Sequence, residues 1–207
     1  MKFLLSLAAL AVTCTGLAQG TSEAILSTSG GISSSGNDTT TGWTFRTTTP
    51  VNVTALGCFA QVFIDNPSVP FVQVGLWNDS GSLWASNSVA FSSPLTDQTR
   101  YASITPVLLN PGETYHIGIY YPGGGLGLGV VGAAVGGTIS NSAAIQLRGT
   151  AFSVSGFAFP VEQPGPDGSI YLGPNFQFSG GVPEPSSLLL LGLGGVLLAA
   201  RWKNRRV

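Results

Sequence analysis

Few side chains in this sequence of 207 residues can do chemistry. A Ser-His-Asp arrangement would need His116, the only histidine, which lies in the middle of a strand-like run from Tyr115 to Ile119. The sequence has no Gly-x-Ser-x-Gly motif, in which a sharp turn exposes a nucleophilic serine. Cys58 lies in an apolar stretch with no neighbour that would activate a thiol. We therefore expect His116 to be structural or at the surface, Cys58 to fill the core, and the protein not to be an enzyme.

The carboxylates show no catalytic pattern either. Glycoside hydrolysis needs two facing carboxylates, whereas Glu23 lies in a polar lead-in, Glu113 in a turn and Glu162 in a proline-rich loop. One histidine and one cysteine outside the N-terminal segment exclude most zinc sites. The oxygen-rich turns around Asp79 and Asp65 leave calcium open, although turn chemistry alone explains them. We expect no cofactor and no metal.

Tryptophans are the remaining candidates for ligand contact. Aromatic rings pack on the apolar faces of sugars, so a carbohydrate-binding module would present several of them on one exposed face. The candidates are Trp43, Trp77 and Trp84. The alternative is that Trp77 and Trp84, which flank one hairpin, fill the core. Both interpretations stay open because the registers of neighbouring strands do not follow from the sequence.

The elements that must position these residues are predicted to be β-strands. Short runs rich in β-branched and aromatic residues alternate with turn signals, and no helical periodicity occurs outside the two ends. The pattern predicts an all-β protein with one β-sandwich or jelly-roll-like domain over 41–181, a glycine-rich loop at 122–137, and a Ser/Thr/Gly-rich lead-in at 19–40 that includes an edge strand or none. Expected strands are 51–56, 59–64, 71–77, 82–85, 101–105, 107–109, 114–121, 144–147, 151–157, 170–172 and 175–178.

The N-terminus is typical of a secretory signal peptide over residues 1–18. Lys2 precedes an apolar stretch, and Gly16 and Ala18 are the small residues of a cleavage site. The residues before Cys14 do not fit a lipobox. Between the two terminal signals, eight acidic residues face three arginines, a net charge of −5. Such a lysine-free, acidic surface argues against nucleic acid as a partner.

The C-terminus combines a short polar motif, an apolar segment and a basic tail. The transmembrane segment is predicted at 187–200. A helix over 186–200 would be roughly 22 Å long, shorter than the ~30 Å of a bilayer core. Positive charge after it places the C-terminus in the cytoplasm. A marginal anchor with a strong stop signal suits transfer to a processing enzyme, and a plain single-pass anchor is the alternative. The motif is Pro183, Glu184 and Pro185, and the stop signal is Arg201, Lys203, Arg205 and Arg206.

These three parts, in this order, resemble the PEP-CTERM sorting signal of Gram-negative bacteria over residues 182–207. The resemblance implies recognition of Pro183, Glu184 and Pro185 by an exosortase, a membrane transpeptidase-like cysteine protease, and removal of the helix and tail. It also implies an exopolysaccharide or biofilm-matrix context.

The middle of the chain carries a second resemblance, over residues 41–121. The motifs Gly42-Trp43-Thr44-Phe45, Leu76-Trp77 followed by Gly81, and Asn110-Pro111-Gly112 followed by Tyr115 occur in order. They resemble an uncharacterised extracellular β-sandwich module of secreted bacterial proteins. This resemblance implies a jelly-roll-like fold and no established activity.

We therefore expect an exported, non-enzymatic protein of the cell envelope or extracellular matrix that is initially anchored in the membrane. Its expected partners are an exosortase, the membrane and a polysaccharide. A carbohydrate-binding module that uses exposed aromatics is the alternative. A hydrolase would require His116, Glu113 or a pair of aspartates to converge in a cleft.

Overall fold

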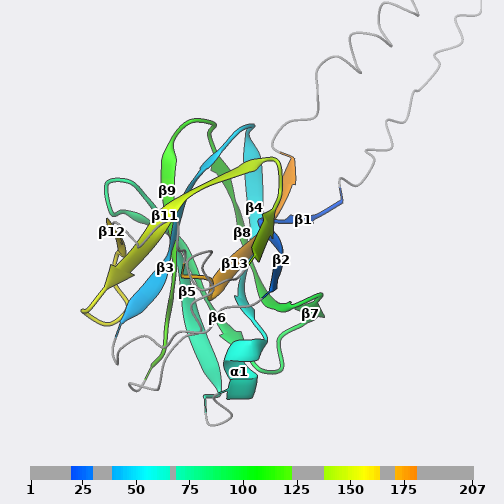
Figure 1. Ribbon diagram of the computed structural model, residues 1–207, viewed down its shortest axis with the longest axis vertical. Coiled ribbons are helices and arrows are strands. Elements are labelled where there is room, and N and C mark those ends of the chain that lie inside the picture. The colour runs from blue at the N-terminus through cyan, green and yellow to red at the C-terminus, as the bar shows by residue number, and fades with distance from the viewer. Residues whose placement is uncertain (1–19, 30–38, 66–68, 123–137, 164–170, 181–207) are drawn as a thin grey trace, which may run out of the picture.

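The structure, a computed structural model, describes residues 20–29, 39–65, 69–122, 138–163 and 171–180. Two large β-sheets, a small third sheet and one short helix make up this part of the chain (Figure 1). The prediction of an all-β sandwich is confirmed, whereas the predicted signal-peptide helix and C-terminal hydrophobic helix lie outside the described residues. Within the ranges given above, none of the helices has the length and apolarity needed to cross a bilayer.

The larger sheet has the strand order β12-β11-β3-β9-β5-β6, and the smaller one β1-β13-β4-β8-β7. Strands β10 and β2 form the third sheet, and the strand pairs within all three sheets are antiparallel. The elements are β1 (Ser22–Glu23), β2 (Ile25–Ser29), β3 (Thr40–Thr47), β4 (Val51–Phe59), α1 (Gln61–Asp65), β5 (Phe71–Asn78), β6 (Leu83–Ala90), β7 (Leu95–Thr96), β8 (Thr99–Leu109), β9 (Thr114–Tyr120), β10 (Thr138–Asn141), β11 (Ile145–Ser153), β12 (Val161–Gln163) and β13 (Pro174–Gly180).

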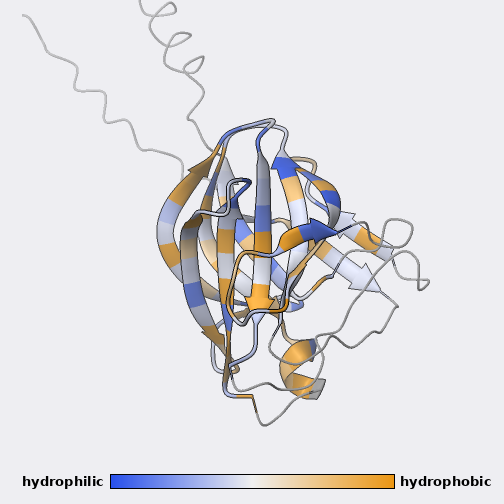
Figure 2. Ribbon diagram, turned by 90° about the vertical axis from the view of Figure 1, so that its left-hand side faces the viewer, coloured by the Kyte–Doolittle hydropathy of each residue, from blue (hydrophilic) through white to orange (hydrophobic). Residues whose placement is uncertain are grey.

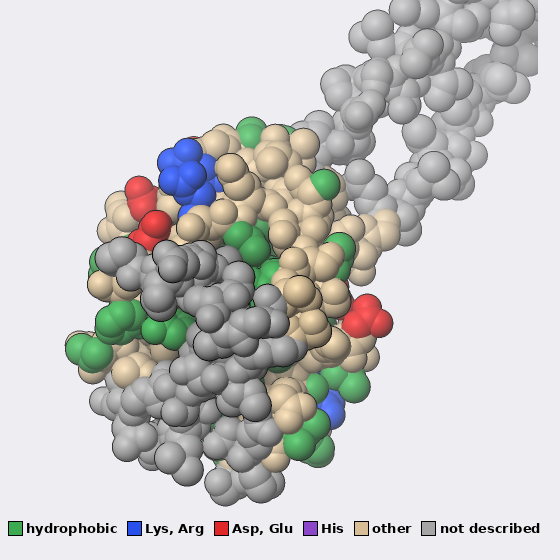
Figure 3. All heavy atoms as spheres, viewed as in Figure 1, with side chains coloured by type: hydrophobic (Ala, Val, Ile, Leu, Met, Phe, Trp, Pro, Cys, Tyr) green, Lys and Arg blue, Asp and Glu red, His purple; other side chains and the backbone are tan. Residues whose placement is uncertain are grey.

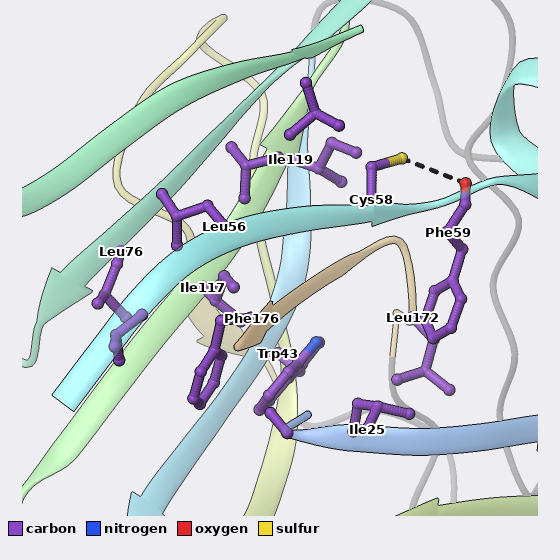
Figure 4. Packing of buried hydrophobic residues seen from close by; sticks show 14 of the residues in the cluster. Ile25, Trp43, Leu56, Cys58, Phe59, Leu76, Ile117, Ile119, Leu172 and Phe176 are labelled. Atoms are coloured by element: carbon purple, nitrogen blue, oxygen red, sulfur yellow. Dashed lines mark hydrogen bonds between the residues drawn. The ribbon is translucent and has the colours of Figure 1, made fainter. Parts of the chain in front are cut away.

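The core lies between the two large sheets. Hydrophobic and hydrophilic residues alternate along several strands, as a half-buried strand requires (Figure 2). Trp43 of β3 links the sheets: its ring stacks on Phe176 of β13 with centroids 5.9 Å apart, and its indole N–H donates to the Pro174 carbonyl at 2.9 Å (Figure 4). The largest wholly buried side chains are Trp43, Tyr115, Phe45, Phe176, Ile25, Leu56, Leu76, Leu109, Ile117 and Ile119.

The strand predicted at 59–64 is wrong. Phe59 ends β4, and the chain turns into α1, whose first turn is closed by the amides of Phe63 and Ile64 donating to the Ala60 carbonyl. Val62 and Phe63 are buried while Ile64 is exposed. The apolar run thus continues from β4 as a short helix at one end of the sandwich (Figure 1).

The lead-in contributes to the core. Ala24 and Ile25 are wholly buried, and Asn175 of β13 holds the Ile25 backbone through both of its side-chain atoms. Its Oδ1 accepts from the Ile25 amide at 3.0 Å, and its Nδ2 donates to the Ile25 carbonyl at 2.9 Å. The first and last described segments are therefore fastened to each other.

Candidate functional site

His116 lies on the outer face of the larger sheet, beneath the segment that joins β11 to β12. Its Nδ1 is 2.8 Å from the Pro160 carbonyl, its Nε2 is 3.2 Å from Asp79 Oδ1, and its ring lies 4.6 Å from that of Phe159. Both partners are acceptors, so a neutral imidazole can donate to only one of them and an imidazolium donates to both. His116 is buried while Asp79 is 72% exposed. The His116 ring thus contacts the segment between β11 and β12 through Pro160 and Phe159.

Glycines make room for this cover. Gly42, Gly118 and Gly75 are paired side by side across β3, β9 and β5. A Cβ atom at Gly75 would collide with the Trp77 ring, and one at Gly118 would come within 3.1 Å of Pro160. Glycine inside a strand marks a close approach of another group, and here that group is an aromatic layer. Trp77 packs there against Phe157, with centroids 5.4 Å apart.

Cys58 is wholly buried in β4 among the core residues (Figure 4). Burial raises the pKa of its thiol well above the usual range, and the thiol donates to the Phe59 carbonyl. A thiolate nucleophile needs the opposite environment, a partly exposed site near positive charge. The geometry fits a core side chain.

Two of the three glutamates that the structure describes accept hydrogen bonds from structural neighbours. Glu113 accepts from the Tyr115 hydroxyl at 2.7 Å, and that hydroxyl accepts from the Asn110 amide at 2.8 Å. Burial, followed by the hydrogen bond to Glu113, raises the pKa of Tyr115 to about 12. Glu162 accepts from the Thr44 hydroxyl at 3.0 Å. Each of these two carboxylates fastens a turn or an edge strand.

Glu23 belongs to a group that the sequence did not reveal. This glutamate of β1 is 8% exposed and lies beside Tyr101, and neither Glu23 Oε1 nor the Tyr101 hydroxyl has a hydrogen-bond partner of good geometry. Burial, opposed in part by Tyr101, and the negative charge of Asp97 raise the pKa of Glu23 above its ordinary value of 4.5. A lone glutamate in a Ser/Thr-rich lead-in gave no sign of this packing.

The oxygen-rich turn around Asp79, for which calcium is the less favoured interpretation, is organised by its own hydrogen bonds. Asn78 Oδ1 accepts from the Ser80 hydroxyl and the Ser82 amide, each at 2.8 Å, and Asp79 faces His116. The side chain of Asp65 lies outside the description. Across the residues that the structure does describe, no three His, Cys, Asp or Glu side chains group together as metal ligands.

The three tryptophans do not share a face. Trp43 is in the core, Trp77 is 3% exposed beneath Phe157, and Trp84 is 38% exposed in β6. The Trp84 ring lies 5.5 Å from that of Tyr115. Of these rings, Trp84 alone presents substantial surface to solvent.

The predicted sorting residues Pro183, Glu184 and Pro185, and the predicted stop signal at Arg201, Lys203, Arg205 and Arg206, lie outside the described residues. The structure does show where they attach. Strand β13 ends at Gly180, which pairs with Val51 of β4. The sorting sequence therefore begins directly after a central strand of the smaller sheet.

No curated protein matches this chain. A family model described as the PEP-CTERM protein-sorting motif matches residues 181–206, which confirms the resemblance seen in the C-terminal sequence. The all-β structure is consistent with the resemblance to an extracellular β-sandwich module. The chain carries a PEP-CTERM protein-sorting motif at residues 181–206, which implies an exported, envelope-associated protein that an exosortase processes.

Proposed function

We propose that this protein is a non-enzymatic component of the cell envelope or extracellular matrix, delivered there through its sorting motif. The observation that carries the proposal is the environment of His116. Both of its ring nitrogens face acceptors from the fold, the Pro160 carbonyl and Asp79, and its ring lies under Phe159. The residue best suited to acid–base chemistry thus acts as a structural fastener.

The surface supports the same conclusion. Charged side chains are sparse on the described part of the face in Figure 3, where uncharged polar and hydrophobic side chains prevail. Acidic residues outnumber basic ones between the terminal signals. A weakly charged sandwich of this kind suits packing within a hydrated polysaccharide better than binding a polyanion.

The first test follows the intact mass and location of the full chain in cells with and without the exosortase. We expect loss of the C-terminal segment and appearance in the matrix fraction only when the exosortase is present. The triple variant Pro183→Ala, Glu184→Ala, Pro185→Ala should stay full-length in the membrane. The matched control is Ser186→Ala with Ser187→Ala, which should be processed normally. A full-length protein in both strains would overturn sorting.

A second experiment tests the matrix role by itself. The processed protein should remain with the matrix of cells that make exopolysaccharide and pass into the medium of cells that do not. Equal release from both strains would contradict a matrix role while leaving sorting intact.

The alternative function, carbohydrate binding, rests on Trp84. Trp84 is 38% exposed, and in the sequence it directly follows exposed Leu83 and the turn that carries the Ser80 and Ser82 hydroxyls. An aromatic face beside hydroxyl groups suits a sugar ring. Trp84→Ala should abolish sedimentation of the protein with insoluble matrix polysaccharide, whereas Leu83→Ala should not. Unchanged sedimentation of Trp84→Ala would exclude this ring as the binding platform.

A further inference from the structure

The last strand of the sandwich leads into the sorting motif without a spacer. Gly180 is still paired with Val51, and Pro183 follows three residues later. An extended chain covers at most ~3.5 Å per residue, so the motif begins within about 10 Å of a paired residue. The folded domain therefore lies against whatever binds Pro183, Glu184 and Pro185.

Strand β13 is an internal part of the fold. It lies between β1 and β4 in the smaller sheet, and Phe176 and Phe178 are buried in the core (Figure 1). The sandwich is therefore incomplete until residues up to Phe178 have left the translocation machinery and paired.

The final two residues of β13 are held less firmly than the rest. Strand β1 pairs only with Gln177 and Phe178, so Ser179 and Gly180 are bonded to β4 alone. Ser179 is half-buried and Gly180 is exposed. Release of these two residues lengthens the segment between the last paired residue and Pro183 from two residues to four. Its maximal span then grows to about 17 Å without exposing Phe178. Further release would remove an aromatic side chain from the core.

We propose that the folded sandwich restricts access to the sorting motif, and that the exosortase acts while Ser179 and Gly180 are unpaired from β4. Proteases bind substrates as extended segments, which requires free backbone on both sides of the recognised residues. The inference rests on exosortase processing of this chain. It adds that the end of β13 sets the rate of that processing.

A spacer series tests the proposal. Gly/Ser segments of 5, 10 and 20 residues, lengths chosen for the test, would be inserted between Gly180 and Gly181 of the full chain. Pulse-chase conversion to the shortened form should become several-fold faster with the first insertion and then level off. The matched control places the same insertions after Thr49, in the exposed turn between β3 and β4. Equal rates for all lengths after Gly180 would overturn the proposal.

A disulfide lock provides the converse experiment. Ser179 and Asn52 are register partners on antiparallel strands, a separation that suits a disulfide. Ser179→Cys with Asn52→Cys should slow processing several-fold under oxidising conditions, and reduction or a 10-residue spacer should restore it. Cys58 is buried and does not compete. Processing of the oxidised double variant at the rate of the reduced one would contradict the proposal. A spacer variant that is not processed at all would instead contradict sorting itself.

Discussion

On the outer face of each large sheet an aromatic ring packs over a glycine, but the polar groups beside the two rings differ. On the larger sheet, the ring of Trp77 lies over Gly75, and on the smaller sheet the ring of Tyr101 lies over Gly57. Trp77 is covered by the segment around Phe157, and the neighbouring polar side chain, His116, has partners for both nitrogens. Tyr101 lies beside the Glu23 side chain of β1, a strand of the same sheet, and its hydroxyl and Glu23 Oε1 are buried without partners of good geometry. The difference lies in the polar neighbours of the two rings: His116 beside Trp77 has hydrogen-bond partners, whereas Glu23 beside Tyr101 is a poorly solvated carboxyl group.

The largest expected loss of stability comes from adding a side chain at one of the three paired glycines of the larger sheet, Gly42, Gly118 and Gly75. In Gly42→Ala the added Cβ would overlap the backbone oxygen of Ile117, which cannot move without breaking the β3–β9 pairing. We expect a loss of more than ~3 kcal/mol in unfolding free energy. Urea denaturation followed by circular dichroism measures it. Gly20→Ala, which meets no atom within 4 Å, is the control and should be silent.

The two aromatic layers can be compared directly by Gly75→Ala and Gly57→Ala. Each places a methyl group against a ring, of Trp77 or Tyr101, and should cost about 1–3 kcal/mol. Because the Tyr101 ring lies beside Glu23 of the two-residue strand β1, its displacement in Gly57→Ala should also detach the lead-in. Limited proteolysis within residues 20–29 should therefore accelerate in Gly57→Ala and not in Gly75→Ala. The reverse pattern would show that β1 is held more firmly than the prediction requires.

The hydrogen bonds of the larger sheet's cover are tested at His116. His116→Ala leaves the buried side of the Pro160 carbonyl without its donor and should lower the unfolding free energy by about 1–3 kcal/mol. Asp79→Ala should cost less than ~1 kcal/mol, because Asp79 is largely exposed. Thermal denaturation of both variants decides the point. Equal losses would mean that the stabilisation by His116 comes from its contact with Asp79 and not from its contact with the Pro160 carbonyl.

The buried carboxyl group of Glu23 should make the unfolding free energy depend slightly on pH. Since the folded state raises the pKa of Glu23 above 4.5, the unfolded state releases that proton first as pH rises. The contribution of Glu23 to stability is therefore complete below pH 4.5 and is lost as pH increases through its raised pKa. Glu23→Gln removes the charge and allows an amide to donate to Tyr101. We expect it to gain about 0.5–1 kcal/mol at neutral pH in urea titrations, and to gain nothing at pH 4. A constant difference between the two proteins at all pH values would contradict this account.

Sequence patterns predicted an all-β sandwich and strands such as β4, β5 and β9, because alternation and turn residues are local signals. They did not predict β10 and β12, and Tyr171 and Leu172 of the strand expected at 170–172 lie outside any strand. They missed α1, since Val62 and Phe63 belong to an apolar run, 59–64, that has the composition of a strand. They also left the tryptophans undecided, because Trp43 and Trp77 reach opposite faces through registers that only the pairing sets. The three glycines now found side by side were the available signal for the aromatic layer, each being unusual inside a strand. No local signal linked Glu23 to Tyr101, which lie 78 residues apart in sequence.

The pairing of β1 with β13 also determines how the domain bears mechanical load. Because the two strands are antiparallel, residues 20 and 180 leave the sandwich at the same end (Figure 1). Tension between the two ends would load their hydrogen bonds one pair after another rather than all together in shear. The β1–β13 pairing should thus open at low force, starting at Ser22 and Phe178, and should form again when the tension is released. In such a domain β1 and β13 would separate under tension while the larger sheet and its aromatic layer stay folded.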